Sequence, residues 1–220
     1  MSLDIKNFTE IVISVIIVII LSFSEGSAHE GQHMHNEGKQ TRVEPSGSTY
    51  QLPVINSASD FVLVDRSGER VSLKNLKEKI KIVNFIYTSC PTSCPITLGK
   101  LFKLQEILIK KGLLREKVEM ISITLDPERD NLEKLKKYAN GFNADSNGWL
   151  FLRGTKEKTE KVLSDYDIWT KRLEDGTIDH VMRIYLIDDK DRIREIYNLA
   201  FLQPELVVRD IEMILLRLNI

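Results

Sequence analysis

Short apolar runs alternate with amphipathic segments from residue 81 to the C-terminus, and this alternation limits the possible folds more than any other feature of the chain. Apolar runs of four to eight residues are typical of buried strands, and apolar residues at every third or fourth position are typical of helices. The predicted strands are 81–87, 118–125, 149–152, 181–187 and 192–197. The predicted helices are 95–110, 130–142, 155–164 and a last one that begins at Pro204. Asp130 with Glu133 resembles a capping box at the start of the second helix. This order predicts an α/β domain, in which a central mixed sheet carries helices on both faces.

A β-hairpin is predicted just before this alternation. Residues 61–65 and 69–73 read as two strands, joined by the turn Arg66-Ser-Gly68. The chain of 220 residues is long enough for one α/β domain and a leading segment but too short for two full domains. We therefore expect one domain over residues 51–220. Residues 29–50 are polar, contain several Gly, Ser and Pro residues, and are predicted to be a flexible linker.

The N-terminal segment, residues 1–28, is predicted to be a signal peptide or a membrane anchor. Residues 11–23 are almost uniformly apolar, but about 20 such residues are needed to span a bilayer, so the run fits a secretory signal better. Small residues at Gly26 and Ala28 suit a cleavage site, whereas Lys6 is offset by nearby acidic residues. Whether the segment is cleaved or retained, the domain is predicted to be extracytoplasmic, in a bacterial periplasm. Residues 11–23 would either direct its export or anchor it to the inner membrane.

The charge balance gives no sign of a nucleic-acid partner. The chain has 31 basic and 32 acidic residues, and its formal net charge is −1. Proteins that bind nucleic acid usually concentrate positive charge on one face or one helix. The charged runs of this chain instead have mixed sign and fit solvated helix faces.

The chain's two cysteines, Cys90 and Cys94, lie four residues apart where the strand 81–87 leads into the next helix. Backbone N–H groups at the start of a helix and the helix dipole favour thiolate over thiol. Residues at i and i+4 share one helix face, so both sulfurs can reach one metal ion or each other. This pair is therefore predicted to be the chemical centre of the protein.

His180 is the one histidine inside the predicted domain, at the entrance to the strand 181–187 and at the end of a predicted loop, 171–179. Loops at strand ends in a sheet of this type converge near the helix start that carries the thiols. Two thiolates and one imidazole suit Cu(I), whereas structural Zn²⁺ normally takes four ligands, and the domain offers no fourth Cys or His. A single loop histidine would by itself be better explained as a satisfied hydrogen-bonding group.

Three segments of the chain together resemble the Sco/SenC family of copper chaperones, thioredoxin-fold proteins that help to assemble the copper sites of respiratory oxidases. The segments are Asn84-Phe-Ile-Tyr-Thr-Ser-Cys-Pro-Thr-Ser-Cys-Pro95, Thr124-Leu-Asp-Pro-Glu-Arg-Asp130 and Ile178-Asp-His-Val-Met-Arg-Ile-Tyr-Leu-Ile-Asp188. They occur in the family's order and spacing, and the resemblance runs from about residue 55 to the C-terminus. It implies a thioredoxin-like fold with the hairpin added at its N-terminal side.

The resemblance implies that Cys90, Cys94 and His180 hold one copper ion and that the two thiols can also form a disulfide. It implies that the loop residues Asp126, Pro127, Arg129 and Asp130 shape the site without binding metal. The partners it implies are a copper-accepting oxidase subunit and an upstream copper donor or thiol reductant, with the membrane as a further contact if the N-terminal segment is retained.

Two departures from the family pattern stand near the site. Thr92 occupies a position where the family often has an acidic residue, which removes a local negative charge and could alter partner docking or the thiol potential. The usual Thr-Pro after the D-P-x-R-D run is replaced by Asn131-Leu132, which is expected to change only how a helix begins.

The main alternative function is a thiol–disulfide oxidoreductase with the same fold, which would use Cys90 and Cys94 as catalytic residues on extracytoplasmic cysteines. Reductases of this fold usually space their cysteines by two residues rather than three. They also usually carry a cis-proline where this chain has Met182 or its neighbours. The two roles are compatible, so the chain is expected to be a metallochaperone whether or not it is also an enzyme. A scaffold domain with inert thiols is disfavoured, because prolines flank both cysteines at a helix start.

The linker contains the other histidines, His29, His33 and His35. Together with Met34 they offer nitrogen and thioether donors within seven residues, so an auxiliary copper site is one interpretation. A polar tail that happens to contain histidines is the simpler interpretation and is favoured on composition.

Overall fold

The computed structural model of the chain describes residues 51–76 and 78–218. The predictions for the N-terminal segment, the linker and its three histidines fall outside the described residues and stay predictions. Among the residues that are described, no helix is both long and apolar enough to cross a membrane.

The centre of the domain is a mixed sheet of eight strands. In spatial order the strands are β1 (Asn56–Ser57), β10 (Arg192–Tyr197), β9 (Ile184–Ile187), β4 (Ile80–Ile86), β5 (Val118–Thr124), β6 (Trp149–Arg153), β2 (Val62–Asp65) and β3 (Arg70–Ser72). The three neighbours β4, β5 and β6 run parallel, and the other pairs are antiparallel. Every residue of β4 and β5 is buried, which agrees with the mainly apolar composition of these strands in the sequence.

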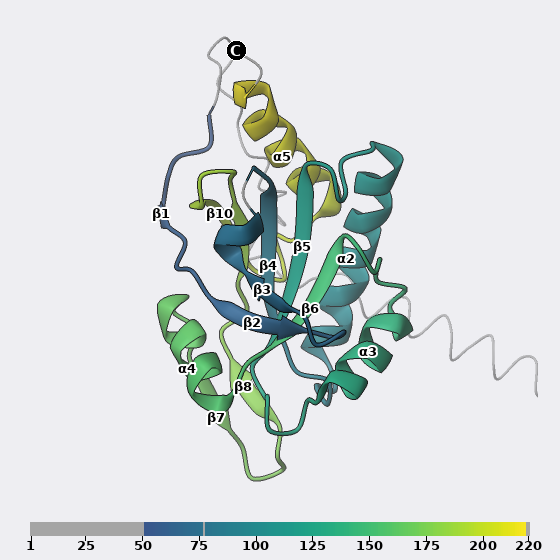
Figure 1. Cartoon of the computed structure of the whole chain (residues 1–220), viewed down its shortest axis with the longest axis vertical. Coiled ribbons are helices and arrows are strands. Elements are labelled where there is room, and N and C mark those ends of the chain that lie inside the picture. Colours follow the sequence, from purple (N-terminus) through teal and green to yellow (C-terminus); the bar gives the residue numbers. More distant parts are fainter. Residues whose placement is uncertain (1–50, 77, 219–220) are drawn as a thin grey trace, which may run out of the picture. The chain divides into compact units, whose positions relative to one another are not determined.

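Helices cover both faces of this sheet (Figure 1). The helices are α2 (Ser93–Lys110), α3 (Leu132–Gly141), α4 (Lys156–Asp165) and α5 (Pro204–Leu218), and a short 3₁₀ helix, η1 (Leu73–Leu76), follows β3. Right-handed crossovers between parallel strands place α2 and α3 on one face, where α5 packs beside α2. On the other face, the ring of Tyr166 at the end of α4 packs at a tilt against Phe85 of β4, with ring centroids 5.8 Å apart.

The predicted N-terminal hairpin is present as β2 and β3, which pair antiparallel across a turn that contains Gly68. The backbone φ of Gly68 is 93°, a value that residues other than glycine rarely adopt. Through β2 this hairpin extends the sheet beyond β6. The loop that carries the thiols follows the C-terminal end of β4, and β4 lies near the middle of the sheet.

Three local predictions differ from the structure. Helix α2 begins at Ser93 rather than Pro95, because a proline within the first turn lacks only an N–H that has no helical partner there. The predicted loop 171–179 is largely a second hairpin, β7 (Thr170–Arg172) and β8 (Ile178–His180), and His180 ends β8. The strand predicted to start at 181 begins only at Ile184, as β9.

The start of α3 also differs from the prediction. Asn131, and not Asp130, caps this helix by accepting the backbone N–H of Lys134 at 2.9 Å. The carboxylate of Asp130 is instead used in contacts with Thr88 and Thr124, described below.

Candidate metal centre

The loop between β4 and α2 holds the two thiols against each other. The backbone N–H of Cys94 donates to the sulfur of Cys90 at 3.3 Å, and the hydroxyl of Ser93 lies 3.4 Å from the same sulfur. Both cysteines are buried, and both are free thiols. Cys94 lies in the first turn of α2, so its position is set by the helix, whereas Cys90 lies in the loop before it.

The two thiols differ in acidity. The thiol of Cys94 donates a hydrogen bond to Cys90, and this contact, against the opposing effect of burial, lowers the pKa of Cys90 to about 4. Ser93 and the backbone N–H groups of Cys94 and Thr92 act in the same direction. Holding its proton toward Cys90 raises the pKa of Cys94, and burial raises it further. The pair is therefore one thiolate with one thiol that donates to it.

His180 presents a nitrogen that nothing in the described part of the chain satisfies. Its Nδ1 lies 3.1 Å from the carbonyl oxygen of Val181. A carbonyl oxygen can only accept, so Nδ1 carries the proton and Nε2 keeps its lone pair. This Nε2 is buried, and it has no hydrogen-bond partner among the described residues. Burial also lowers the pKa of His180, so the imidazole is neutral and Nε2 is available to a metal ion.

Tyr87 contacts both halves of the candidate centre, and sequence reasoning missed it. Its ring packs edge-to-face against His180, with centroids 6.2 Å apart. Its hydroxyl accepts the backbone N–H of Ile178 at 3.1 Å and also hydrogen-bonds the side chain of Cys90. Burial is the main reason that the pKa of Tyr87 is raised. Tyr87 directly follows the buried strand β4, and no local signal in the sequence distinguishes it from the apolar residues of that strand.

The structure brings the two cysteines together but does not gather three metal donors at one point. Among the described residues, no group of three or more His, Cys, Asp or Glu side chains is close enough to hold a metal ion. His180 lies against the ring of Tyr87, whose hydroxyl reaches Cys90. His180 is therefore connected to the two cysteines through Tyr87, which contacts both Cys90 and His180.

The four loop residues predicted to support the site are tied to the surrounding protein. Asp130 accepts hydrogen bonds from the backbone N–H of Thr88 at 3.0 Å, from the hydroxyl of Thr124 at 2.6 Å and from the hydroxyl of Thr88. Because Thr88 lies two residues before Cys90, Asp130 fixes the loop that carries this cysteine.

The other three supporting residues take part in contacts between arginines and oxygen acceptors. Asp126 forms ion pairs with Arg129 and Arg172, and Pro127 accepts from Arg153 through its carbonyl oxygen at 2.7 Å. Arg172 belongs to the hairpin that carries His180, and sequence reasoning did not single it out.

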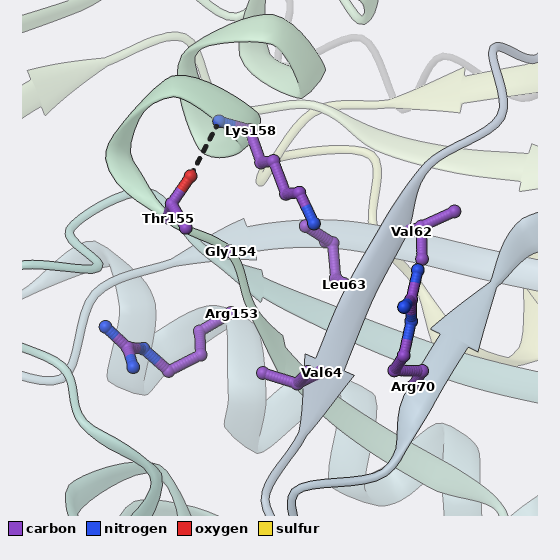
Figure 2. A pocket seen from close by; sticks show the side chains of 8 residues that line it. All are labelled: Val62, Leu63, Val64, Arg70, Arg153, Gly154, Thr155 and Lys158. Atoms are coloured by element: carbon purple, nitrogen blue, oxygen red, sulfur yellow. Dashed lines mark hydrogen bonds between the residues drawn. The ribbon is translucent and has the colours of Figure 1, made fainter.

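A cavity of about 350 Å³ lies elsewhere in the domain, between the β2–β3 hairpin and the start of α4. Figure 2 shows its eight lining residues, with the hydroxyl of Thr155 accepting the backbone N–H of Lys158 at 3.3 Å. The guanidinium of Arg153 points away from Arg70 and Lys158. The lining includes none of the predicted ligands, so this cavity is separate from the candidate metal centre.

Comparison with known proteins identifies the family. The SCO1/SenC family model matches residues 51–216, which is most of the chain. The chain belongs to the SCO1/SenC family. A similar relative is the mitochondrial protein SCO2 homolog of Danio rerio, 28% identical over 187 residues. That match covers 83% of this chain but 65% of the zebrafish protein, so the chain spans slightly less than two thirds of that relative.

Solved structures of Sco proteins have the same fold. Bradyrhizobium japonicum ScoI, solved with copper bound, is 31% identical, with a TM-score of 0.63 over 72% of this chain and 99% of that chain. BsSco, a member of the Sco family of cytochrome c oxidase assembly proteins in which a disulfide switch was identified, is 25% identical, with a TM-score of 0.65 over 74% of this chain and 97% of that chain. The predicted fold class, a thioredoxin-like α/β domain with an added N-terminal hairpin, is confirmed.

Proposed function

We propose that this SCO1/SenC protein is an extracytoplasmic copper chaperone. In this proposal Cys90, Cys94 and His180 bind one copper ion and deliver it to a copper site of a respiratory oxidase. Copper is cargo here, taken from an upstream donor and released to the accepting subunit. The Sco proteins solved with copper bound and the link of BsSco to cytochrome c oxidase assembly support this assignment.

The observation that carries the proposal is the unsatisfied Nε2 of His180. A buried nitrogen with a free lone pair costs free energy unless it gains a partner, and so it is a feature that calls for explanation. A soft cation that also takes the adjacent thiolate of Cys90 would supply that partner. The donor set of two sulfurs and one nitrogen suits Cu(I) and lacks the fourth ligand of a structural Zn²⁺ site.

Copper binding in this proposal includes a small rearrangement. Because the described residues form no ready cluster of three donors, the ion must draw His180 and the two sulfurs together. The proton of Cys94 leaves as its thiolate binds the ion, so uptake of copper releases one proton. Delivery then requires only that an acceptor with thiolate or imidazole ligands compete for the same ion.

The stoichiometry of copper binding tests the proposal. The full chain with reduced thiols, loaded with Cu(I) and freed of excess metal, should retain about one equivalent of copper, measured by elemental analysis, because its donor set serves a single ion. Cys90→Ser and Cys94→Ser should each abolish tight binding. Full copper retention by both variants would refute the assignment.

The unequal acidity of the thiols favours a second candidate function, thiol–disulfide exchange. The Cys90 thiolate would attack a disulfide in a target protein and form a mixed disulfide, with one target sulfur leaving as a thiolate. Cys94 would then lose its proton and attack Cys90, which releases the second target sulfur. The target disulfide gains two electrons, and the Cys90–Cys94 pair loses two as it becomes a disulfide.

Substitution of His180 separates the two functions. His180→Ala removes one of three copper donors but no group that thiol–disulfide exchange requires. We expect this variant to lose most of its copper affinity while the Cys90–Cys94 reduction potential, measured against a glutathione buffer, stays nearly unchanged. Normal copper binding combined with lost exchange activity would reject the chaperone in favour of the oxidoreductase.

A further inference from the structure

The hairpin that carries His180 is not part of the main sheet. Strands β7 and β8 pair only with each other, as a separate two-stranded sheet. Backbone hydrogen bonds to the eight-stranded sheet therefore cannot place His180. A two-stranded hairpin has little stability of its own, so other contacts must fix it on the domain.

The side of the hairpin that faces α4 is only partly packed. A cavity of about 200 Å³ lies between the hairpin, α4 and the loop after β5, and Asp126, Arg172 and Ile178 are among its lining residues. A space of this kind removes packing contacts that would otherwise hold the strands in place. The polar contacts at the hairpin are correspondingly more important for its position.

Two polar contacts connect the hairpin to the rest of the domain near His180. The backbone N–H of Ile178 donates to the hydroxyl of Tyr87, and Nη2 of Arg172 lies 2.8 Å from Oδ1 of Asp126. Arg172 pairs in register with Ile178, two residues before His180 along β8. Movement of Arg172 is thus transmitted directly to the strand that ends in His180.

Asp126 is a rigid anchor for this arginine. Its side chain is 1% exposed, and it also accepts from Nε of Arg129. Its backbone N–H donates to the hydroxyl of Thr124, the last residue of β5, at 3.0 Å. A buried carboxylate held by two guanidinium groups has little freedom to shift, and loss of either partner leaves part of its charge uncompensated.

The side chain of Arg129 lies close to the turn of the hairpin. A Cβ added to Gly176, whose φ is 82°, would lie 3.4 Å from Nη1 of Arg129. The loop after β5 therefore approaches the hairpin at its turn and contacts it through Arg172. These contacts involve Arg129 and Arg172, the two arginines that form ion pairs with Asp126.

We propose that Arg172 is a positioning residue, whose ion pair with Asp126 sets the place of His180 relative to Cys90 and Cys94. The inference rests on the proposed copper-binding function, because His180 needs an accurate position only if it is a ligand. Residues that orient a metal ligand commonly change metal affinity about 10- to 100-fold when they are replaced.

The test is a double-mutant cycle in the full chain between Arg172→Gln and His180→Ala, read as Cu(I) affinity by competition with a chromogenic Cu(I) chelator. Arg172→Gln alone should weaken binding about 10- to 100-fold. In the His180→Ala background the same change should have almost no further effect, because the residue acts through the imidazole that is already gone. In the Cu(II)-loaded protein, Arg172→Gln should also reduce the nitrogen hyperfine coupling of the imidazole in the EPR spectrum.

Arg115→Gln is the matched control. Arg115 forms an ion pair with Asp145, and its side chain is 50% exposed, close to the 45% of Arg172. Arg115 precedes β5 and Asp145 precedes β6, so this pair lies at the N-terminal ends of the parallel strands, whereas the thiols follow the C-terminal end of β4. Arg115→Gln should leave Cu(I) affinity and hyperfine coupling unchanged. If Arg172→Gln fails to fold, Arg172→Lys replaces it in the cycle; it keeps the charge without the fork of donors and should show a smaller loss.

The outcomes are distinguishable. A wild-type chain that binds no copper overturns the proposed function and this inference with it. A wild-type chain that binds copper, with Arg172→Gln no weaker than Arg115→Gln, overturns the inference alone. Full additivity of the two substitutions would also overturn it, because Arg172 would then act on copper independently of His180.

Discussion

At the scale of single residues, the unequal protonation of the two thiols sets the chemistry of the site. The sequence places both cysteines at a helix start, where the backbone is expected to favour thiolate for the pair. Only Cys90 gains that benefit, because Cys94 uses its own proton as the donor to Cys90. This asymmetry depends on the close approach of the two sulfurs. The spacing of the cysteines in the sequence does not determine that distance.

The pH dependence of alkylation tests this asymmetry. Cys90 has its pKa lowered to about 4, so its thiolate fraction, and with it the iodoacetamide rate, should be almost constant between about pH 6 and pH 8. For an ordinary thiol, with a pKa of about 8.5, the thiolate fraction and the alkylation rate rise about tenfold per pH unit over that range. Mass spectrometry after timed quenching measures the rate at each pH.

The control for this profile is Cys94→Ala, which deletes the thiol that donates to Cys90. The pKa of Cys90 should then rise, and the rate should increase with pH across the same range. A flat profile in both proteins would show that the backbone and Ser93, rather than Cys94, stabilise the thiolate.

At the scale of elements, the parts of the fold with a strong local pattern were predictable, and the parts set by distant contacts were not. The buried strands β4 and β5 and the helix after Pro204 follow directly from apolar runs and periodicity. The β7–β8 hairpin was missed because its strands are three residues long and its residues are mostly polar or charged. The pair Asp175-Gly176 is a known hairpin signal and could have indicated its turn.

Asp130 shows why the role of a residue cannot always be predicted from the local sequence. Its spacing from Glu133 resembles a capping box, yet its carboxylate binds Thr88, 42 residues away. Asn131 takes over as the cap of α3. The prediction was wrong because a contact between distant elements outcompeted a local one, so the local pattern could not have revealed it.

The stability of Asp130→Asn tests the importance of this contact. The amide of Asn offers one acceptor oxygen and directs an N–H₂ group at donors from Thr88 or Thr124, so buried donors lose their partners. We expect the free energy of unfolding, measured by urea denaturation, to fall by about 1–3 kcal/mol. Asp175→Asn is the control, because Asp175 also accepts a backbone N–H and a hydroxyl, from Thr177, but is exposed; its effect should stay within about 0.5 kcal/mol.

At the scale of the whole molecule, the proposed copper binding and disulfide formation would exclude each other, because both would use the same two sulfurs. Oxidation joins Cys90 to Cys94 and removes both thiolates from the donor set. His180 then remains as the single proposed ligand in the described part of the chain, and one neutral imidazole binds copper weakly compared with two thiolates and an imidazole. The redox state of the pair would therefore decide whether the protein carries copper.

The copper affinity of the oxidised protein tests this coupling and also the role of the N-terminal histidines. The full chain, oxidised to a verified intramolecular disulfide, should bind copper far more weakly than the reduced chain in the same chelator competition. The reduced Cys90→Ser/Cys94→Ser protein is the control and should match the oxidised chain, because both lack the two thiolates. Equal affinity of the reduced and oxidised wild-type chains would mean that the ligands lie elsewhere. His29, His33 and His35 would then be the donors to test, by replacing all three with alanine in the oxidised protein.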